Sequence, residues 1–447
     1  MIFEAEFESM RAADLRNLQS KHLAALAASV YERVDFYRSK FDEAGVKPAD
    51  VSTIDDITKL PITRKQDLRD NYPFGLFGQE RGQISRIHAS SGTTGKPTVV
   101  GYTRDDVDLF ARVNARCLAM AGAEPRMTLH NAYGYGLFTG GLGLHYGAER
   151  LGMTVVPVSG GMTERQIMLI TDFQPDMISC TPSYGLTLAQ EFAERGVSPQ
   201  DISLSIGILG AEPWTEMMRS EVDAGLGLKS SNIYGLSEII GPGVSCECVE
   251  ERSGSHINED HFFPEILDPI TAEPVPEGQE GVLVLTTLTK QAQPLLRYWT
   301  GDITSLSSED CRCGRTLRRM ALIKGRTDDM LIIRGVNLYP TEVELVLGNI
   351  AELSPHYRLV VSREGTLDEL SVETEVTDEV FKRVGGDALD DEVIAADEFL
   401  AGLRSRIKHG LKESLGVTAG VALKAPGSVP RSEGGKLNRV EDRRKLS

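Results

Sequence analysis

Apolar residues recur at helical spacing through most of the first 80 residues, as in AADLRNLQSKHLAALAASVYERV. A repeat of three to four residues places these side chains on one face, so the segment predicts amphipathic helices. The pattern changes around residues 84–103, where ISRIHA and TVVGYT are rich in β-branched residues and predict two strands. These strands flank the loop SSGTTGKPT, which therefore joins strand to strand.

From Asp105 to about Ser237 helical and strand patterns alternate. Helices are predicted for DVDLFARVNARCLAMAG, TERQIMLITDF, GLTLAQEFAERG and WTEMMRSEVDAGLG, and strands for TVVPVS, DMISC and LSIGILG. Such alternation indicates parallel strands joined by crossover helices.

The rest of the chain has two further patterns. Short strands such as GVLVLTTLT predominate from Val244 to about Ile333, and the remainder predicts a helix in PTEVELVLG, strands in YRLVVS and ELSVETEV, and a helix in EFLAGLRSRIKHGLKESLG. We predict an α/β fold with two domains. Residues 1–327 form a large domain of mixed sheets with crossover helices, and residues 328–447 form a small mobile α+β domain. The joint lies in GRTDDMLIIRGVN.

Charge and composition narrow the classes of function. The formal charge of −17 argues against nucleic-acid binding, because phosphate backbones are met by clustered Lys and Arg. No apolar stretch approaches the ~18 residues of a membrane helix, and the acidic N-terminus is unlike a secretory signal, so we expect a cytoplasmic protein without membrane contact. The last 17 residues are basic instead, and are read either as a solvated tail or as an element that carries a lysine to an anionic ligand.

The loop at residues 90–96 has the composition of a phosphate-binding loop but not its usual spacing. A Walker loop needs four residues between its glycines and joins a strand to a helix, whereas two residues separate Gly92 from Gly95. The loop is therefore either a plain hairpin turn or a different kind of phosphate cradle, built from backbone N–H groups, hydroxyls and Lys96.

Single motifs are weak evidence, since YGLSE, TGD and EGGKLNR each also fit an ordinary turn or a flexible tail. Their order along the chain is more specific. SSGTTGKPT, GAEP, YGLSE, TGD, GRTDDMLIIRGVNLYPTEVE and a glycine-flanked lysine together resemble the adenylate-forming superfamily of acyl-CoA synthetases and adenylation domains. Within it, AYGYGLFTGGLGLHYGAERLG, GAEPWTEMMR, NEDHFFPEILDP and TTLTKQAQPLLRY are similar to the phenylacetate–CoA ligase branch. The resemblance runs from about residue 20 to 440.

The resemblance implies a role for each motif in bringing a carboxylate against the α-phosphate of ATP. Two anions repel each other, so positive charge and oriented donors must surround them. Tyr234 and Gly235 would contact adenine, Ser237 would donate to the α-phosphate, and Glu238 would bind Mg²⁺. Lys436 would bridge the two anions. The other expected nucleotide contacts are Ser90, Ser91, Gly92, Thr93, Thr94, Gly95 and Lys96 around the β- and γ-phosphates, Ala211, Glu212 and Pro213 at adenine, and Asp302 and Arg326 at ribose.

Two reactions would share the small domain. After adenylate formation, a hinge at Asp328 would withdraw Lys436 and present the segment Arg334, Gly335 and Val336 to the pantetheine arm of coenzyme A. Glycine at 335 would let a narrow arm pass close to the backbone.

An acyl pocket is expected around the aromatic residues of AYGYGLFTGG. Tyr133, Tyr135, Gly136 and Phe138, with Gly235, would suit a flat aromatic acid such as phenylacetate, although each aromatic equally fits core packing. Benzoate-, anthranilate- and hydroxyanthranilate-type acids are rivals. Trp299 stands in RYWTGD where an arginine often follows the tyrosine in this branch, which leaves the local packing near the nucleotide open.

Six cysteines include two C-x-C pairs, which match the ligands of structural zinc together with His256. We predict a zinc-binding subregion at 246–313 with Cys248, His256, Cys311 and Cys313 as ligands. Cys246 is left out on the assumption that the thiols of the first pair point to opposite faces of a strand. Free thiols are the alternative.

The main hypothesis is an ATP- and Mg²⁺-dependent aryl-acid–CoA ligase with structural zinc, and we expect it to form a homodimer. The nearest alternative is an adenylation enzyme that loads an anthranilate- or hydroxyanthranilate-type acid onto a carrier protein. A zinc-containing nucleotide-binding protein without ligase activity is the third.

Overall fold

Helices form the N-terminal part of the chain, as the apolar spacing predicted. The computed structural model describes residues 1–89, 97–327, 329–334, 336–364, 367–385, 389–432 and 437–446. The first helical elements are α1 (Ala5–Glu8), α2 (Ala12–Arg33), α3 (Asp35–Ala44), α4 (Lys65–Asp70) and short 3₁₀ turns at Pro48–Asp50, Ile54–Lys59 and Arg81–Gln83. Buried positions of α2 recur at Leu15, Gln19, Leu23 and Leu26–Ala27, so one face of this helix packs on the core.

A nine-stranded mixed sheet, in the order β13-β14-β9-β8-β7-β6-β5-β3-β4, is the centre of the large domain. Neighbours from β4 to β7 pair in parallel, and those from β7 to β13 pair antiparallel. The strands are β3 (Thr128–Asn131), β4 (Thr154–Val156), β5 (Met177–Cys180), β6 (Ile206–Gly210), β7 (Lys229–Leu236), β8 (Gly241–Glu247), β9 (Ser255–Ile257), β13 (Leu306–Ser307) and β14 (Arg319–Met320). The predicted parallel alternation is confirmed for the part up to β7.

Five helices accompany this sheet in the chain, as crossover connections require. They are α5 (Arg104–Met120), α6 (Gly140–Leu151), α7 (Thr163–Phe173), α8 (Pro182–Glu194) and α9 (Glu216–Leu226), with a 3₁₀ turn at Pro199–Asp201. Helix α6 was not among the predicted helices.

Two smaller β-structures complete the large domain. The two strands predicted on either side of the glycine-rich loop are present as β1 (Arg86–Ala89) and β2 (Val99–Tyr102), and they pair antiparallel. A four-stranded antiparallel sheet contains β10 (Phe262–Leu267), β11 (Gly281–Thr287), β12 (Tyr298–Thr304) and β15 (Gly325–Arg326).

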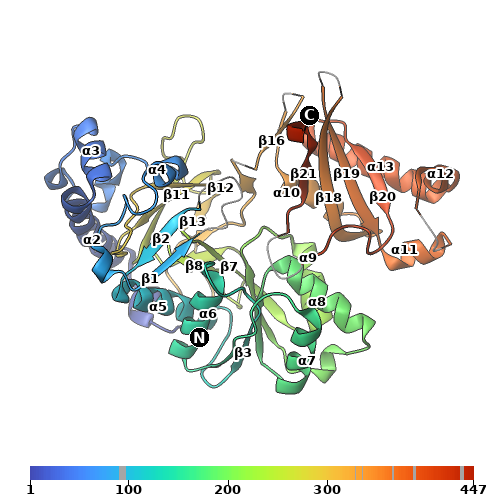
Figure 1. The fold of residues 1–447 in the computed structure, drawn as a ribbon, viewed down its shortest axis with the longest axis horizontal. Coiled ribbons are helices and arrows are strands. Elements are labelled where there is room, and N and C mark those ends of the chain that lie inside the picture. The colour runs from blue at the N-terminus through green and yellow to red at the C-terminus, as the bar shows by residue number, and fades with distance from the viewer. Residues whose placement is uncertain are drawn as a thin grey trace.

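The C-terminal part builds a separate α+β unit, which lies beside α8 and α9 (Figure 1). Its sheet has the order β20-β19-β18-β21, with β18 (Leu353–Glu364), β19 (Leu367–Val376), β20 (Gly420–Lys424) and β21 (Val440–Asp442). The hairpin β16 (Leu331–Ile333) and β17 (Val336–Leu338) precedes it. The helices are α10 (Pro340–Gly348), α11 (Asp378–Arg383), α12 (Asp391–Ala396) and α13 (Glu398–Leu415), with a last 3₁₀ turn at Arg443–Leu446. One apolar cluster, running from Leu331 to Leu423, forms the core of this unit alone.

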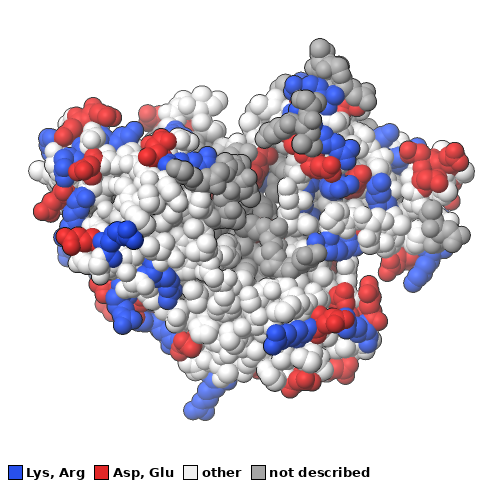
Figure 2. All heavy atoms as spheres, in the orientation of Figure 1, with Lys and Arg blue, Asp and Glu red and all other residues white. Residues whose placement is uncertain are grey.

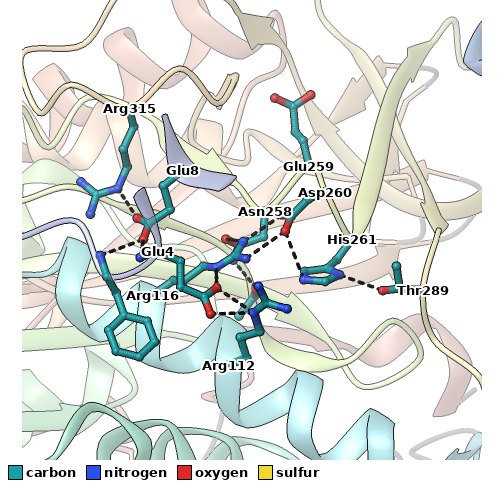
Figure 3. A network of polar contacts seen from close by, with 12 residues as sticks. Glu4, Glu8, Arg112, Arg116, Asn258, Glu259, Asp260, His261, Thr289 and Arg315 are labelled. Carbon is teal, nitrogen blue, oxygen red and sulfur yellow. Dashed lines mark hydrogen bonds and ion pairs between the residues drawn. The ribbon is translucent and has the colours of Figure 1, made fainter. Parts of the chain in front are cut away.

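A buried ion-pair network fastens the first residues of the chain to the large domain (Figure 3). The guanidinium of Arg116 on α5 is fully buried and donates to both carboxylate oxygens of Asp260, at 2.8 and 2.9 Å. Glu4 accepts from Arg112 and Arg116, and Glu8 accepts from Arg315 at 2.7 Å. Because each buried charge has an opposite partner, the N-terminal segment is held as part of the fold.

The surface charge is mixed on the face shown in Figure 2, where Lys and Arg alternate with Asp and Glu. Within the described ranges, no helix is both long and apolar enough to cross a membrane.

Candidate active site

The expected ribose contacts are brought together on neighbouring strands. Asp302 on β12 lies opposite Arg326 on β15, and the two side chains form an ion pair. The hydroxyl of Tyr234, at the end of β7, donates to the other oxygen of Asp302 at 2.6 Å. Burial, followed by the charge of Asp302, raises the pKa of Tyr234 well above its usual value, so this phenol stays a donor. The cluster thus fixes the Asp302 carboxylate between a phenol hydroxyl and a guanidinium.

The backbone around the expected adenine contacts is tightly constrained. Ala211 has a φ of +74°, a left-handed conformation that costs a non-glycine residue energy and is often found at functional sites. At Gly235 a Cβ would lie 1.8 Å from the carbonyl oxygen of Gly241, so only glycine fits there. Glu212, between Ala211 and Pro213, uses its carboxylate to accept the N–H of Ser183 at 2.6 Å.

The residues expected at the α-phosphate and Mg²⁺ lie directly beyond β7. The hydroxyl of Ser237 is 3.3 Å from that of Thr139, and Glu238 is buried. The ammonium of Lys290, also buried, donates to the backbone carbonyl of Glu238 at 3.1 Å and lies over the ring of Tyr102. Burial lowers the pKa of Lys290 to about 8. Lys290 was not predicted from the sequence, although it is the one charged residue in the run TTLTKQAQPLL and could have been noticed for that reason.

The expected acyl residues separate into a buried and a partly exposed group. Tyr133 belongs to an apolar cluster between the sheet and the helices, so for this residue the structure agrees with the alternative of core packing. Tyr135 and Phe138 are partly exposed and Gly136 is exposed. The hydroxyl of Tyr135 accepts from the Asn131 amide at 2.8 Å and lies 3.1 Å from Nδ1 of His145. Neither Asn131, at the end of β3, nor His145, on α6, was predicted, because only the fold brings the strand end and the helix together at Tyr135.

The acyl loop is also joined to the hairpin that leads into the glycine-rich loop. The carbonyl oxygen of Leu137 accepts the N–H of Ala89 at 3.1 Å and lies 3.0 Å from Nδ1 of His88. Residues 90–96 themselves, from Ser90 to Lys96, lie outside the described residues, so their expected phosphate role stays a prediction.

Several expected residues of the small domain also fall outside the described ranges, namely Asp328, Gly335 and Lys436. Arg334 has a φ of +52° and donates to the carbonyl of Asp368 at 3.0 Å, and Val336 begins β17. Two arginines of the basic tail form ion pairs with the small domain: Arg431 pairs with Glu375, and Arg444 pairs with Asp368. For these arginines the solvated-tail interpretation is wrong, because their partners are carboxylates of the β18–β19 hairpin.

The four predicted metal ligands converge. The ligand atoms of Cys248, His256, Cys311 and Cys313 all lie within 4.8 Å of one another. Nδ1 of His256 is 3.1 Å from the carbonyl oxygen of Leu317, a contact that fixes the orientation of the ring and leaves Nε2 for the cluster. Three thiols and one imidazole fit a tetrahedral zinc ion.

The reason assumed for leaving Cys246 out is wrong. Residues two apart on a regular strand share a face. Strand β8 ends at Glu247, so Cys248 lies beyond the strand and its direction is not set by the pleat. Cys246 remains on β8 and is buried in the apolar cluster that contains Cys117.

Trp299, which stands where an arginine often follows the tyrosine in this branch, contacts an arginine from another segment. The guanidinium of Arg64, immediately before α4, stacks over the Trp299 ring at 4.5 Å. The indole therefore packs between β12 and the N-terminal helices, while Asp302 keeps its place.

Two family descriptions match the chain: residues 73–289 match AMP-binding enzyme, and residues 335–444 match AMP-binding enzyme C-terminal domain. The chain is 64% identical over 445 residues to the phenylacetate–coenzyme A ligase of Thermus thermophilus, covering 100% of both chains. It is 50% identical over 431 residues to that of Aromatoleum evansii, covering 96% of this chain and 95% of the other. Fold and site thus define an AMP-binding, adenylate-forming enzyme. The chain belongs to the phenylacetate–coenzyme A ligase family, whose members are AMP-forming acid–thiol ligases, and the predicted resemblance is confirmed.

The structure is also similar to crystal structures of 2-hydroxyisobutyryl-CoA ligase, at 29% identity. In the postadenylation state with 2-HIB-AMP, the TM-score is 0.90, covering 100% of this chain and 93% of that one. With 2-HIB-AMP and CoA in the thioesterification state, the TM-score is 0.71, covering 99% and 92%. Both structures are of the same ligase, so the difference between the two TM-scores reflects a different arrangement of its parts in the two states. The present arrangement is closer to the postadenylation state.

Proposed function

We propose that the chain ligates an aromatic carboxylic acid, with phenylacetate as the first candidate, to coenzyme A. The carboxylate oxygen attacks the α-phosphorus of ATP, the bond to the β-phosphate breaks, and pyrophosphate leaves. The CoA thiol then loses its proton to solvent and attacks the acyl carbonyl, the bond from the carbonyl carbon to the phosphate oxygen breaks, and AMP leaves. The observation that supports this most is the Tyr234–Asp302–Arg326 cluster in a chain that is 64% identical to a phenylacetate–CoA ligase.

In this proposal the chain's own groups position the two anions. Asp302 and Arg326 hold the ribose, and the Ala211–Pro213 backbone and Tyr234 border the adenine. Ser237 donates to the α-phosphate, residues 90–96 surround the outer phosphates, and Lys436 lies between carboxylate and phosphate. The carboxylate of Glu238 is a hard oxygen ligand of the kind that Mg²⁺ prefers, and the ion supplies charge neutralisation when it is bound with ATP.

The two parts of the chain divide, in this proposal, at residues 327 and 328. Support comes from the apolar cluster that runs from Leu331 to Leu423 without any member before residue 328 among the buried residues described. The small domain would then move as a unit and serve each reaction in turn.

The acid is tested by pyrophosphate release with a panel of phenylacetate, benzoate, 2-aminobenzoate, 3-hydroxy-2-aminobenzoate and medium-chain fatty acids. We expect phenylacetate to have the highest kcat/KM. A fatty acid that exceeds every aromatic acid would overturn the proposed substrate class. A carrier-protein acceptor would require that CoA does not accept the acyl group, and the size of the protein in solution tests the expected homodimer.

The Cys248–His256–Cys311–Cys313 cluster is proposed to hold one structural zinc ion. Four protein ligands leave no open position for substrate, and their convergence from β9 and two loops ties these segments together. Metal analysis of freshly purified, reduced protein should find about one zinc per chain. Cys311→Ser should lower that content and the midpoint of thermal unfolding while the order of preference among acids is unchanged. Absence of zinc from the wild-type protein would contradict the assignment.

A further inference from the structure

The C-terminal segment is fastened to the large domain on both sides of residues 433–436. Before them, the carbonyl oxygen of Ser432 accepts from the hydroxyl of Thr187 at 3.3 Å. After them, the backbone N–H of Leu437 donates to Oε2 of Glu212 at 3.1 Å. The stretch between these contacts contains Lys436, which lies outside the described residues.

Helix α8 presents one polar face to this segment. Ser183, Thr187 and Gln190 follow one another at spacings of four and three residues and therefore lie on the same side of the helix. Oε1 of Gln190 accepts from Arg431 at 3.3 Å, and its Nε2 lies 2.7 Å from Nε2 of His356. These contacts join the small domain to α8, which lies next to it in Figure 1.

The carboxylate of Glu212 accepts hydrogen bonds from both domains, one on each of its oxygens. Oε1 accepts the N–H of Ser183 in the first turn of α8, where a helix leaves N–H groups without intrahelical partners and favours negative charge. This bond lies within the large domain. Oε2 is left to accept the N–H of Leu437.

We infer that Glu212 is a positioning residue whose carboxylate latches the segment following Lys436 onto the N-terminal end of α8 during adenylate formation. The inference rests on the proposed two-step reaction. It is consistent with the closer similarity to the postadenylation state of 2-hydroxyisobutyryl-CoA ligase than to its thioesterification state. A contact made only in one arrangement shifts the population toward that arrangement.

We expect loss of this contact to slow the first half-reaction more than the second. Without the latch, the arrangement that serves the first half-reaction is less populated, while the second half-reaction does not need the contact. Hydrogen bonds to a charged acceptor are among the stronger ones, so we expect Glu212→Ala to slow acid-dependent pyrophosphate release about tenfold or more. Thioester formation from supplied phenylacetyl-adenylate and CoA should be slowed much less than pyrophosphate release, because it does not need the contact with Leu437.

Two further variants separate the latch from other roles of Glu212. Glu212→Gln keeps one of the two acceptor oxygens, so its loss should have the same direction and a smaller size. Leu437→Pro removes the donor N–H and leaves Glu212 intact, and it should reproduce the selective loss. Glu191→Gln, which changes a carboxylate of α8 that pairs with Arg195, is the matched control and should behave as wild type.

The measurements are the KM for ATP, the rate of pyrophosphate release and the single-turnover rate of thioester formation. A selective loss of pyrophosphate release with an unchanged KM for ATP supports the latch. Equal loss in both half-reactions, a loss explained by a raised KM for ATP, or no loss in any of the three variants overturns it. If Glu212→Ala does not fold, Glu212→Gln and Leu437→Pro decide the question. Failure of the wild-type protein to release pyrophosphate with any acid is a separate outcome, which contradicts the proposed function itself.

Discussion

At the residue scale, the ion pair of Arg116 and Asp260 shows how strongly one buried charge depends on another. The Arg116 side chain is fully buried. Burial of Asp260 would raise the pKa of that carboxyl, yet neighbouring His261 and the Arg116 guanidinium hold it below its usual value. A charge left in such a place without its partner lacks both water and a counter-ion.

We therefore expect Arg116→Met to lower the free energy of unfolding of the large domain by about 3–5 kcal/mol, because Asp260 loses its partner. Urea denaturation measures this. The double variant Arg116→Met with Asp260→Asn should recover part of the loss, since no uncompensated charge remains. Arg11→Met, which breaks the exposed pair with Asp14, is the control and should have no measurable effect. A single variant as stable as wild type would show that the network is not an important source of stability.

At the element scale, the interface between α8 and β18 contains a histidine that burial keeps neutral. Burial first, and then the charges of Arg431 and Arg439, lowers the pKa of His356 to about 3. The neutral ring can accept from the Gln190 amide, whose oxygen is already occupied by Arg431. An ordinary histidine has a pKa near 6.5.

The sign of the pH effect follows from these two values. Between pH 6.5 and pH 3 the unfolded chain binds the His356 proton and the folded chain does not, so this contribution to stability is complete above pH 6.5 and is lost as the pH falls. We expect the free energy of unfolding of the small domain to fall by roughly 1.5 kcal/mol more for wild type than for His356→Gln between pH 6.5 and pH 5. Identical slopes for the two proteins would contradict the assignment.

The elements also show what the sequence can and cannot predict. The hairpin around residues 90–96, the alternation up to β7 and helix α10 follow from short-range patterns. Helix α6 was not predicted, because GGLGLHYGAERL contains four glycines and glycine disfavours helices. The structure requires them: a Cβ would lie 2.4 Å from the Phe110 ring at Gly143 and 2.5 Å from Asn114 at Gly147. Close packing of α6 on α5 thus overrides local propensity.

The residues of the site also divide into those that sequence motifs predict and those that only the fold brings together. Tyr234, Asp302 and Arg326, and the four metal ligands, were predicted because their motifs are specific in order and spacing. Lys290, Asn131, His145 and the latch at Glu212 depend on which segments the fold places together. The N–H of Leu437 in particular is a backbone group, and every residue except proline could supply it.

At the scale of the whole molecule, the account requires one small domain to serve two reactions. Lys436→Ala should abolish adenylate formation and spare thioester formation from supplied adenylate, because the first reaction alone needs a cation between two anions. Gly335→Leu should do the reverse, since its side chain would obstruct the pantetheine arm. Asp328→Pro should chiefly slow the second step by hindering the exchange. Separate assays of the two half-reactions measure these effects, and equal impairment of both by Lys436→Ala would refute the two-arrangement account.

Rapid-quench analysis can determine whether an acyl-adenylate precedes the thioester. Enzyme, ATP, Mg²⁺ and phenylacetate are mixed without CoA, and the quenched products are identified by mass spectrometry. We expect enzyme-bound phenylacetyl-adenylate at about one per active site together with pyrophosphate, and its conversion to phenylacetyl-CoA and AMP when CoA is added. Formation of ADP and orthophosphate, or no adenylate until CoA is present, would contradict this expectation.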